Sequence, residues 1–363
     1  MGAAYSGDGV CCGWRSKPST EAAGDDVNEE IMSLIENTRG AKVKDRPDFT
    51  EFLPVAGNIG RESAAQCARD GLDSQAVREL RATMPVAPSA ENLPTAGAWG
   101  GRHFGAAVAV NKRASMEDSV LGCVDDDTGC VLLAAIDGHA GSSAAQIVST
   151  SLKDAVFAQP QIGTGALCTA FSRLDAKLRS DAMANAEAEL SAGACATAVV
   201  IDGCYAHVAS VGDTCLLVCS ATAEGPGRIE RVTPAHTPKE AGESSRLRLD
   251  GIEPGESLPC GLSVSRAFGS HDGSGEKGRG LTVEPFSKSV PLSNEVEFLM
   301  LVSDGVEEAM SVEAAAKHIR QKLRRGRGAK AAVEDLVKLA CKSRDCFDNI
   351  CVAVWVVRDP PPY

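Results

Sequence analysis

Two apolar runs that each end in Asp-Gly constrain the fold of this chain more than any other feature. The run at residues 131–136 leads into Asp137, and the run at residues 298–302 leads, after one serine, into Asp304. Runs that are apolar at every position predict strands buried on both faces. Each aspartate then follows a buried strand at a glycine turn, so its carboxylate is held on a rigid frame and points out of the core. One Asp-Gly is an ordinary turn, but two such strand ends indicate acidic groups that meet at a cation site.

Two further segments with acidic residues stand beside other apolar runs: Glu117-Asp118 and Asp348-Asn349. Hard cations prefer oxygen ligands to thiolates or imidazoles, so these positions favour a site for hard cations. Each position also has a structural explanation of its own. The pair at Glu117 is typical of a solvated turn, Asp304 of a helix N-cap, and Asp348 of a loop before an edge strand.

The acidic composition argues against a general nucleic-acid binder. The formal net charge is −12, so nothing would offset the repulsion of nucleic-acid phosphates. The 14 cysteines are scattered without a CxxC pair, and several lie inside apolar runs, where a free thiol behaves as a small apolar side chain. This pattern favours reduced cysteines in an intracellular protein over a disulfide framework. No apolar run approaches the ~18 residues of a membrane span, and no secretory signal follows the start.

The first residues carry a lipidation pattern. Gly2 and Ser6 stand at the positions of an N-myristoylation signal, with Gly2 exposed once the initiating methionine is removed. Cys11 and Cys12 follow closely, as palmitoylation sites do. One acyl chain gives only reversible membrane binding, so a second chain is its physical complement. We therefore expect dual acylation; the alternative is a disordered start rich in small residues, with two incidental cysteines.

Composition and pattern divide the chain into four parts. They are a flexible acylated leader at 1–24, an N-terminal helical extension with a linker at 25–100, a main domain at 101–358 and a short tail at 359–363. In the extension we expect an amphipathic helix from Asp25 to Gly40, a helical stretch at about 61–83 and a Pro/Ala/Gly-rich linker from Pro85 to Gly101. The extension suggests no chemistry.

The main domain alternates strands with pairs of helices. Strands are expected at 104–110, 131–136, 196–202, 205–211, 214–219, 228–233, 296–302 and 350–357. Helices are expected at about 142–158, 163–190, 311–325 and 330–343. The basic residues from Arg320 to Arg327 fall at the end of the third helix, where we expect them to be solvated. This order of elements predicts two sheets packed together with helices outside.

Seven short motifs follow one another along the main domain. They are Arg113–Asp118, Asp137–Gly141, Thr197–Val200, Val211–Thr214, Leu262–Gly269, Ser303–Gly305 and Asp348-Asn349. In this order they resemble the metal-dependent serine/threonine protein phosphatases of type 2C, the PPM family, over about residues 101–358. Each motif alone is weak, and the shared order makes the resemblance specific. It implies that the main domain is catalytic, with an α+β fold of two packed, mainly antiparallel β-sheets flanked by helix pairs and a two-metal Mg²⁺ or Mn²⁺ centre at one end.

The resemblance also implies roles for individual residues. The implied metal ligands are Asp137 bridging both ions, Glu117 and the Gly138 carbonyl on one, Asp304 and Asp348 on the other, Asp118 through water, and Asp213 on a weaker third ion. Arg113 matches the arginine that grips the substrate phosphate, a task suited to its planar fork of donors. His139 matches the histidine proposed as general acid. Two cations activate a water and neutralise charge on the phosphoryl group, which very slow phosphomonoester hydrolysis requires.

The chain departs from the family pattern at several positions, none of which removes a ligand of the two-metal core. Ala140 replaces a glycine, which we expect to restrict the backbone only slightly. Glu308 stands where an aspartate of the third metal site is usual, which lengthens that site by one methylene. The other departures are Thr214, Cys215, Ala235, Ser270 and the segment 251–259 in the region of the family's substrate-shaping flap. They bear on substrate choice and metal affinity more than on activity.

The sequence therefore predicts a Mg²⁺/Mn²⁺-dependent phosphatase that hydrolyses phosphoserine and phosphothreonine in proteins. We expect a monomer that binds no nucleic acid and is tethered by its acyl chains to the cytoplasmic face of a membrane, the plasma membrane first, with a cytosolic pool. Two alternatives stay open: a pseudophosphatase that binds phosphoproteins, and an enzyme for a non-protein phosphate ester. The intact set of carboxylates favours an enzyme over a pseudophosphatase.

Overall fold

The computed structural model describes residues 59–60, 75–84, 96–184, 191–203, 205–222, 227–272 and 274–358. The helix expected after Asp25 and the lipidation positions Gly2, Cys11 and Cys12 lie outside these ranges. Within the described ranges, no helix is both long enough and apolar enough to cross a membrane.

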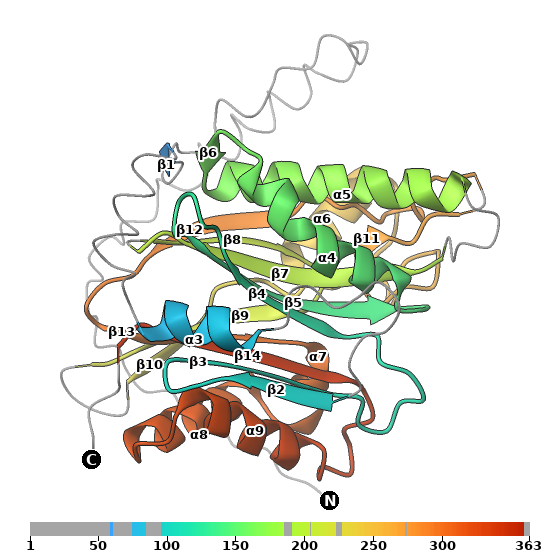
Figure 1. The fold of residues 1–363 in the computed structure, drawn as a ribbon. Helices are drawn as coiled ribbons and strands as arrows, with labels where there is room; N and C mark the ends of the chain where they lie inside the picture. The colour runs from blue at the N-terminus through green and yellow to red at the C-terminus, as the bar shows by residue number, and fades with distance from the viewer. Residues whose placement is uncertain are drawn as a thin grey trace, which may run out of the picture. The chain divides into compact units, whose positions relative to one another are not determined.

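Two antiparallel sheets form the centre of the structure (Figure 1). The first contains, in spatial order, β10 (Arg228–Arg231), β9 (Cys215–Ser220), β13 (Val296–Val302), β14 (Ile350–Val356), β3 (Phe104–Ala109) and β2 (Ala96–Gly100). The second contains β12 (Phe286–Pro291), β8 (Tyr205–Val211), β7 (Gly193–Ile201), β5 (Val131–His139) and β4 (Ser119–Val124), with β11 (Phe268–Gly269) paired to β7. A separate pair joins β1 (Ile59–Gly60) to β6 (Gln161–Ile162).

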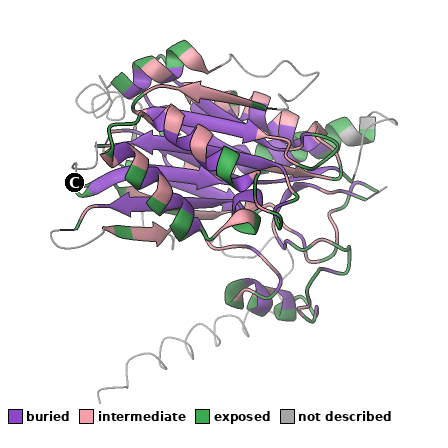
Figure 2. Cartoon of the chain, turned by 90° about the horizontal axis from the view of Figure 1, so that it is seen from below, coloured by how far each residue is buried: buried purple, intermediate pink, exposed green. Residues whose placement is uncertain are grey.

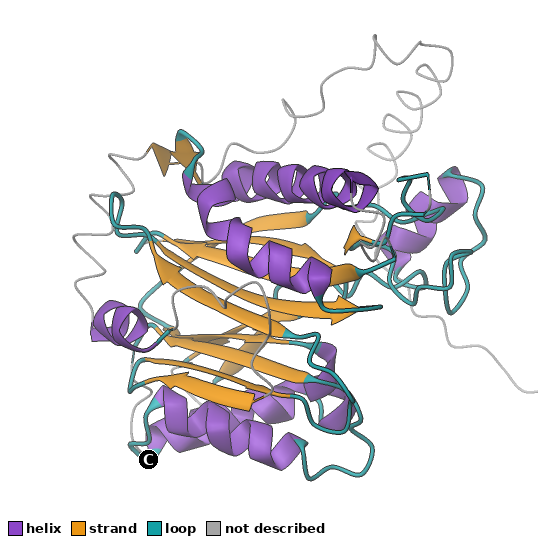
Figure 3. Ribbon diagram, turned by 45° about the vertical axis from the view of Figure 1, so that its right-hand side comes forward, coloured by secondary structure: helices purple, strands orange, loops and turns teal. Residues whose placement is uncertain are grey.

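Helices cover the outer face of each sheet (Figures 1 and 3). The second sheet carries α4 (Ser143–Phe157) and α5 (Thr164–Ala184), and the first carries α8 (Val312–Arg324) and α9 (Ala329–Ala340). Of the shorter helices, α7 (Asp304–Ala309) follows β13, α6 (Ala241–Leu249) lies between β10 and β11 in sequence, and α3 (Gln75–Thr83) packs against β2 and β4. This helix–sheet–sheet–helix arrangement confirms the expected α+β fold.

The central strands of both sheets are buried because nearly all of their side chains are apolar. All residues of β13 and β14 are buried, and β5 is buried from Val131 to Ile136 and opens only at its last three residues. Figure 2 shows the buried residues following both sheets, with exposed residues on the helices outside. Each sheet has the other sheet on one face and helices on the opposite face, so both faces are covered. The prediction made from the two apolar runs is confirmed.

The expected linker at 85–101 is wrong for residues 96–100, which form β2. This strand pairs with β3 from Ala96 opposite Ala109 to Gly100 opposite Gly105. Ala and Gly have a low intrinsic preference for strands, so residues 96–100 carry little strand signal; the neighbouring strand supplies the hydrogen bonds. Part of the N-terminal extension therefore belongs to the first sheet.

The basic end of α8 is not fully solvated, contrary to expectation. Arg320 is only 4% exposed, and its Nε donates to Glu297 Oε2 at 2.6 Å. Its Nη2 donates to two backbone carbonyls near β9 and β10. Glu297 lies inside the apolar strand β13 and is fully buried, and a buried carboxylate needs a partner. One of the basic residues at the end of α8, Arg320, is thus the ion-pair partner of the buried Glu297.

Besides β2, the strands β4 and β12, the two-residue strands β1, β6 and β11, and the short helices α6 and α7 were not expected. Among them, β4 is interrupted by Gly122, and the half-exposed edge strand β12 contains Lys288 and two serines. Neither has the continuous apolar run or the regular alternation that marks a strand in a sequence. Leu80 of α3 lies over Gly122, where a Cβ would come within 2.7 Å of it, so the glycine makes room for this helix.

Candidate metal centre

Three aspartates meet where strands of the two sheets end. Asp137 lies near the end of β5, Asp213 follows β8, and Asp304 begins α7 directly after β13. One carboxylate oxygen of each lies within 4.8 Å of those of the other two. Because β5 and β8 belong to the second sheet and β13 to the first, the group exists only when the two sheets pack together.

The glycine of each Asp-Gly pair lets a second acidic segment approach. The N–H of Gly138 donates to the Glu117 carbonyl at 3.2 Å, and a Cβ at Gly138 would stand within 2.5 Å of that oxygen. A Cβ at Gly305 would collide with the carbonyl oxygen of Asn349. The glycine turns expected at these pairs are not formed, because Asp137-Gly138 continues β5 and Asp304-Gly305 begins α7. The two Asp-Gly pairs are instead the places where the Glu117 and Asp348 segments pack against the strand ends.

The aspartates of this site have raised pKa values. Burial first, and then the charges of Asp118 and Asp304, hold the pKa of Asp137 well above its usual range. Burial also holds the pKa of Asp118 well above its usual range. Burial, together with the charge of Asp213, raises the pKa of Asp304 to about 7. These four residues, called the carboxylate cluster below, repel one another unless protons or cations neutralise them.

The carboxylate cluster has the donor set of a site for hard divalent cations. Asp118 Oδ2 and Asp304 Oδ1 are buried and accept no hydrogen bond from the part of the chain that the structure describes. A buried carboxylate oxygen without a partner costs free energy. Crowded oxygen ligands with excess negative charge are what Mg²⁺ and Mn²⁺ bind best. The residues present therefore fit the ions that the sequence predicts.

Asn349 connects the Glu117 segment to the Asp348 segment through hydrogen bonds. Its Oδ1 accepts a hydrogen bond from the Glu117 N–H at 2.7 Å, and its Nδ2 donates to the carbonyls of Val110 and Ser115. Its own N–H donates to Asp348 Oδ1 at 2.7 Å. The sequence analysis assigned no role to Asn349, and its place directly after a predicted ligand was the only signal.

Arg113 lies at the edge of the site, where its Nη2 pairs with Asp348 Oδ2 at 2.5 Å. The hydrogen bond with Asp348 raises the pKa of Arg113. Glu117 and Asp348 lie outside the group of three aspartates that share the 4.8 Å limit. The structure thus gathers three of the predicted ligands and places Glu117, Asp348 and Arg113 beside them.

His139 is a neutral imidazole in this arrangement. Burial, and then the charge of Lys277, lowers the pKa of His139 to about 4. Its Nε2 lies 2.8 Å from the hydroxyl of Ser270, which stands where the family pattern has an aspartate. With a pKa near 4, His139 carries only one ring proton at neutral pH, so the role of general acid requires it first to gain a second one.

The backbone at Ala140 is more restricted than the sequence analysis expected. Ala140 has φ +55°, in the left-handed region, and Gly141 follows with φ +118°. A residue with a Cβ pays about 1–2 kcal/mol for the left-handed conformation, whereas glycine does not. The alanine therefore stores strain three residues after Asp137.

Glu308, at the position of a third-metal ligand, is engaged with the loop before Asp348. Its Oε2 accepts hydrogen bonds from the N–H groups of Phe347 at 2.9 Å and Asp348 at 3.2 Å. Asp213, its expected partner at a third ion, belongs to the carboxylate cluster. Glu308 thus positions the Asp348 loop in this structure.

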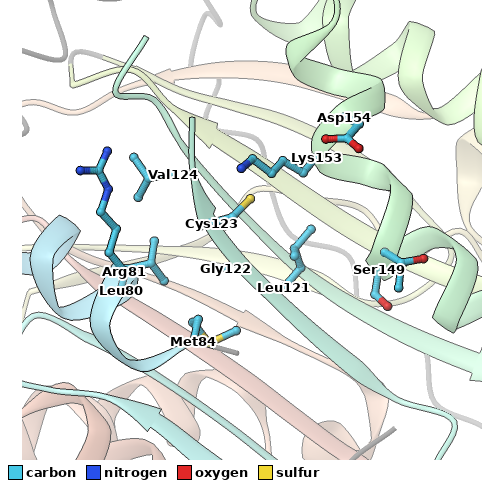
Figure 4. Close-up of a pocket in the computed structure, with 11 residues that line it drawn as sticks. Leu80, Arg81, Met84, Leu121, Gly122, Cys123, Val124, Ser149, Lys153 and Asp154 are labelled. Carbon is cyan, nitrogen blue, oxygen red and sulfur yellow. The ribbon is translucent and has the colours of Figure 1, made fainter. Parts of the chain in front are cut away.

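A separate pocket lies away from the carboxylate cluster. It has a volume of about 360 Å³ and lies between α3, β4 and α4 (Figure 4). Leu80, Met84 and Leu121 give it apolar walls, and Arg81 and Lys153 add positive charge. No residue predicted for the site lines this pocket.

Comparison with known proteins gives consistent matches. A family model described as protein phosphatase 2C matches residues 103–350. Protein phosphatase 2C 57 of Arabidopsis thaliana is 27% identical over 283 residues, which cover 67% of this chain and 71% of that protein. The probable protein phosphatase 2C 33 of Oryza sativa subsp. japonica is 33% identical over 259 residues, 64% of this chain and 55% of that protein. The chain thus spans little more than half the length of some relatives.

Solved structures show the same fold. A serine-threonine phosphatase 2C from Toxoplasma gondii aligns with a TM-score of 0.59 and 18% identity over 73% of this chain and 99% of that one. A C. elegans sex determining protein aligns with a TM-score of 0.60 and 20% identity over 73% of this chain and 66% of that one. These likenesses define the class of fold as a type 2C phosphatase sandwich. The chain itself belongs to the protein phosphatase 2C family, because the family model covers more than half of its length.

Proposed function

We propose that this protein hydrolyses phosphoserine and phosphothreonine in proteins with two divalent cations, Mg²⁺ or Mn²⁺. The observation that carries the proposal is the carboxylate cluster, with its crowded charges and two buried oxygens that have no hydrogen-bond partner among the described residues. Membership of the family supports the reaction class. Asp137 would bridge the two ions, Glu117 and the Gly138 carbonyl would complete one, and Asp304 and Asp348 the other.

The chain's own residues would bind and orient the substrate. When bound, the cations supply a water of lowered pKa and neutralise charge on the phosphoryl oxygens. Arg113 presents a planar fork of donors that suits two phosphate oxygens. Its present partner is Asp348, so the substrate phosphate competes with that carboxylate for the guanidinium. His139 would take up a proton before donating it to the leaving alkoxide, because its pKa is about 4.

Phosphate release from a phosphothreonine peptide tests the proposal. We expect turnover with Mn²⁺ or Mg²⁺ and none after chelation with EDTA. The matched variant is Asp137→Asn, which keeps the size of the side chain and removes its charge; it should lose hydrolysis while its circular dichroism spectrum stays that of the parent. A parent protein that binds the peptide in the presence of Mn²⁺ but releases no phosphate is a pseudophosphatase, and the proposal is then wrong.

The role of Arg113 has its own test. Arg113→Ala should lower kcat/KM for a phosphopeptide through the loss of a charge-assisted fork, an effect of roughly 1.5–3 kcal/mol. Arg228→Ala is the control, since Arg228 lies on β10 and pairs with Glu230. An unchanged kcat/KM in Arg113→Ala would show that Arg113 serves only to hold Asp348.

We also propose that N-terminal acylation tethers the protein to the cytoplasmic face of a membrane. The support is the sequence pattern of Gly2 and Ser6 followed by Cys11 and Cys12. With a gain of about 0.8 kcal/mol per buried CH₂, membrane binding through one acyl chain is reversible, whereas two chains retain the protein at the membrane. Gly2→Ala should release the protein into the soluble fraction, and the double variant Cys11→Ser, Cys12→Ser should weaken retention, both with unchanged phosphate release. Membrane fractionation of Gly2→Ala like that of the parent would overturn this proposal.

A further inference from the structure

Two loops beside the carboxylate cluster, residues 111–115 and 341–348, are tied into one surface, called the rim surface below. Lys112 Nζ donates to two carbonyls of the second loop, at 2.8 and 3.2 Å. Asn111 Nδ2 donates to two more, at 3.1 and 3.0 Å. Each loop also carries one residue of the predicted site. The two loops of the rim surface therefore form one unit, which lies beside the carboxylate cluster and includes Arg113 and Asp348.

Phe347 stands exposed on the rim surface. Its residue is 60% exposed, although aromatic side chains are usually buried. Its N–H donates to Glu308 Oε2 at 2.9 Å, and Lys112 Nζ lies 4.4 Å from the centre of its ring. A cation over an aromatic face is attracted by the ring quadrupole, so this contact favours the observed position of the ring. The exposed ring of Phe347 is thus presented beside Asp348.

Other exposed large apolar side chains in the described ranges lie elsewhere. They are Met183, Tyr205, Leu249 and Leu339. Single exposed apolar side chains are common on protein surfaces and do not by themselves indicate a binding site. Phe347 differs because it is the one that directly adjoins a predicted site residue, and because its ring contacts Lys112. Aromatic residues are typical of the centre of a protein-binding surface.

The rim surface is basic, although the chain as a whole is acidic. Lys112, Arg113, Lys342 and Arg344 are exposed there, and their four charges exceed those of Asp345, of Asp348, which pairs with Arg113, and of the exposed Glu308, which borders the second loop. The formal net charge of the whole chain is −12. A local excess of positive charge attracts phosphate and acidic side chains and repels basic ones. The surface therefore combines an apolar anchor with a preference for acidic ligands.

We propose that the rim surface binds the polypeptide that flanks the phosphorylated residue. Phe347 contacts an apolar side chain of the substrate, and Lys112 and Arg344 attract acidic residues beside it. A small phosphate ester has no flanking chain to make these contacts, so this surface selects phosphoproteins over metabolites. The inference rests on the proposed function and gives the substrate class: acidic phosphoprotein segments with an apolar residue next to the phosphate-bearing one.

Two substrates separate this inference from the proposed function. One is a phosphothreonine peptide with leucine and aspartate flanking residues, and the other is p-nitrophenyl phosphate. Phe347→Ala should lower kcat/KM for the peptide about tenfold and for the small ester less than twofold. Tyr205→Ala is the matched control, an exposed aromatic residue at the end of β8 opposite to Asp213, and it should change neither value. Equal changes on both substrates, or none on the peptide, would overturn the inference.

Binding provides a second readout that does not depend on turnover. Fluorescence anisotropy of the labelled peptide with the Mn²⁺-loaded protein should show about tenfold weaker binding to Phe347→Ala than to the parent. Lys112→Gln should reduce the preference for the aspartate-flanked peptide over the same peptide with asparagine. If the parent releases no phosphate but Phe347→Ala still loses peptide binding, the proposed function fails and this inference holds. Unchanged binding in both variants would refute the inference.

Discussion

Two buried acidic sites of this molecule differ in how the negative charge of their carboxylates is neutralised. In the carboxylate cluster Asp137, Asp213 and Asp304 lie close together, Asp118 interacts with them electrostatically, and two of the carboxylate oxygens have no partner among the described residues. Glu243 of α6 is only 2% exposed, and both of its oxygens are occupied. Arg266 donates to Oε1 at 2.9 and 2.5 Å, and Arg246 and Ser265 donate to Oε2 at 2.9 and 2.6 Å.

The pKa values of the two sites move in opposite directions. Burial and the charge of Asp213 raise the pKa of Asp304 to about 7. Burial also acts on Glu243, but hydrogen bonds from Arg266 and its neighbours outweigh it and lower the pKa of Glu243 to about 2. Burial of an acid therefore does not by itself identify a functional site. A buried carboxylate that the chain neutralises is structural, whereas a cluster that the chain leaves unneutralised favours a cation from outside.

The largest expected difference concerns turnover. Asp304→Asn removes one charge from the carboxylate cluster, and metal-dependent hydrolysis should fall roughly 10³-fold, because several kcal/mol of transition-state stabilisation are lost. In EDTA the same variant should melt at a higher temperature than the parent, because a repelled charge is gone. Phosphate release and thermal unfolding measure the two effects. Turnover like that of the parent would contradict the metal assignment.

The opposite stability effect is expected at Glu243. Glu243→Ala leaves Arg246 and Arg266 without their buried partner, and the free energy of unfolding should fall by about 3–5 kcal/mol. Glu256→Ala is the control: Glu256 pairs with Lys239 at the surface, where such a pair contributes at most about 1 kcal/mol. Urea unfolding measures both. A loss below 1 kcal/mol in Glu243→Ala would show that the guanidinium groups find solvent, and the contrast between the two sites would disappear.

The metal-free protein should show two opposite dependences of stability on pH. The folded-state pKa of Glu243 is about 2 against an ordinary 4.5, so its contribution is complete above pH 4.5 and is lost as the pH falls toward 2. The folded-state pKa of Asp304 is about 7 against 3.8, so its contribution is complete below pH 3.8 and is lost as the pH rises through 7. Urea unfolding in EDTA from pH 3 to 8 should therefore flatten on the acid side in Glu243→Gln and on the neutral side in Asp304→Asn. Parallel pH profiles for the two variants would count against the comparison.

The smallest expected effect separates backbone strain from charge repulsion near the carboxylate cluster. Ala140→Gly relieves a left-handed alanine and should raise the free energy of unfolding by up to about 1 kcal/mol, after the entropic cost of glycine. Ala176→Gly, an exposed position inside α5, should instead lower it by about 1 kcal/mol. Chemical denaturation of both variants checks the signs. A loss of stability in Ala140→Gly would mean that the backbone at Ala140 is not strained and that charge repulsion is the only source of strain in this part of the site.

Much of the fold followed from local patterns in the sequence. The continuous apolar runs before Asp137 and Asp304 predicted two buried strands, because a short run that is apolar at every position is typical of a strand covered on both faces. The strand β2 was missed, because Ala and Gly carry little strand signal and its pairing with β3 depends on a segment elsewhere in the chain. Arg320 was misjudged for a similar reason: its charge is visible in the sequence, but the buried carboxylate of Glu297 beneath it is not.

The candidate site could likewise be predicted only in part from local sequence patterns. The sequence by itself determined which acidic residues stand at strand ends, since residue type and apolar periodicity are local properties. Only the tertiary structure decided that Asp213 joins Asp137 and Asp304, and that Asn349 binds the Glu117 segment. It also decided that Glu243 is neutralised by two arginines while the carboxylate cluster is not. The physical reason is that pKa shifts and unpaired oxygens depend on burial and on neighbours far away in the chain, which are set when the two sheets pack together.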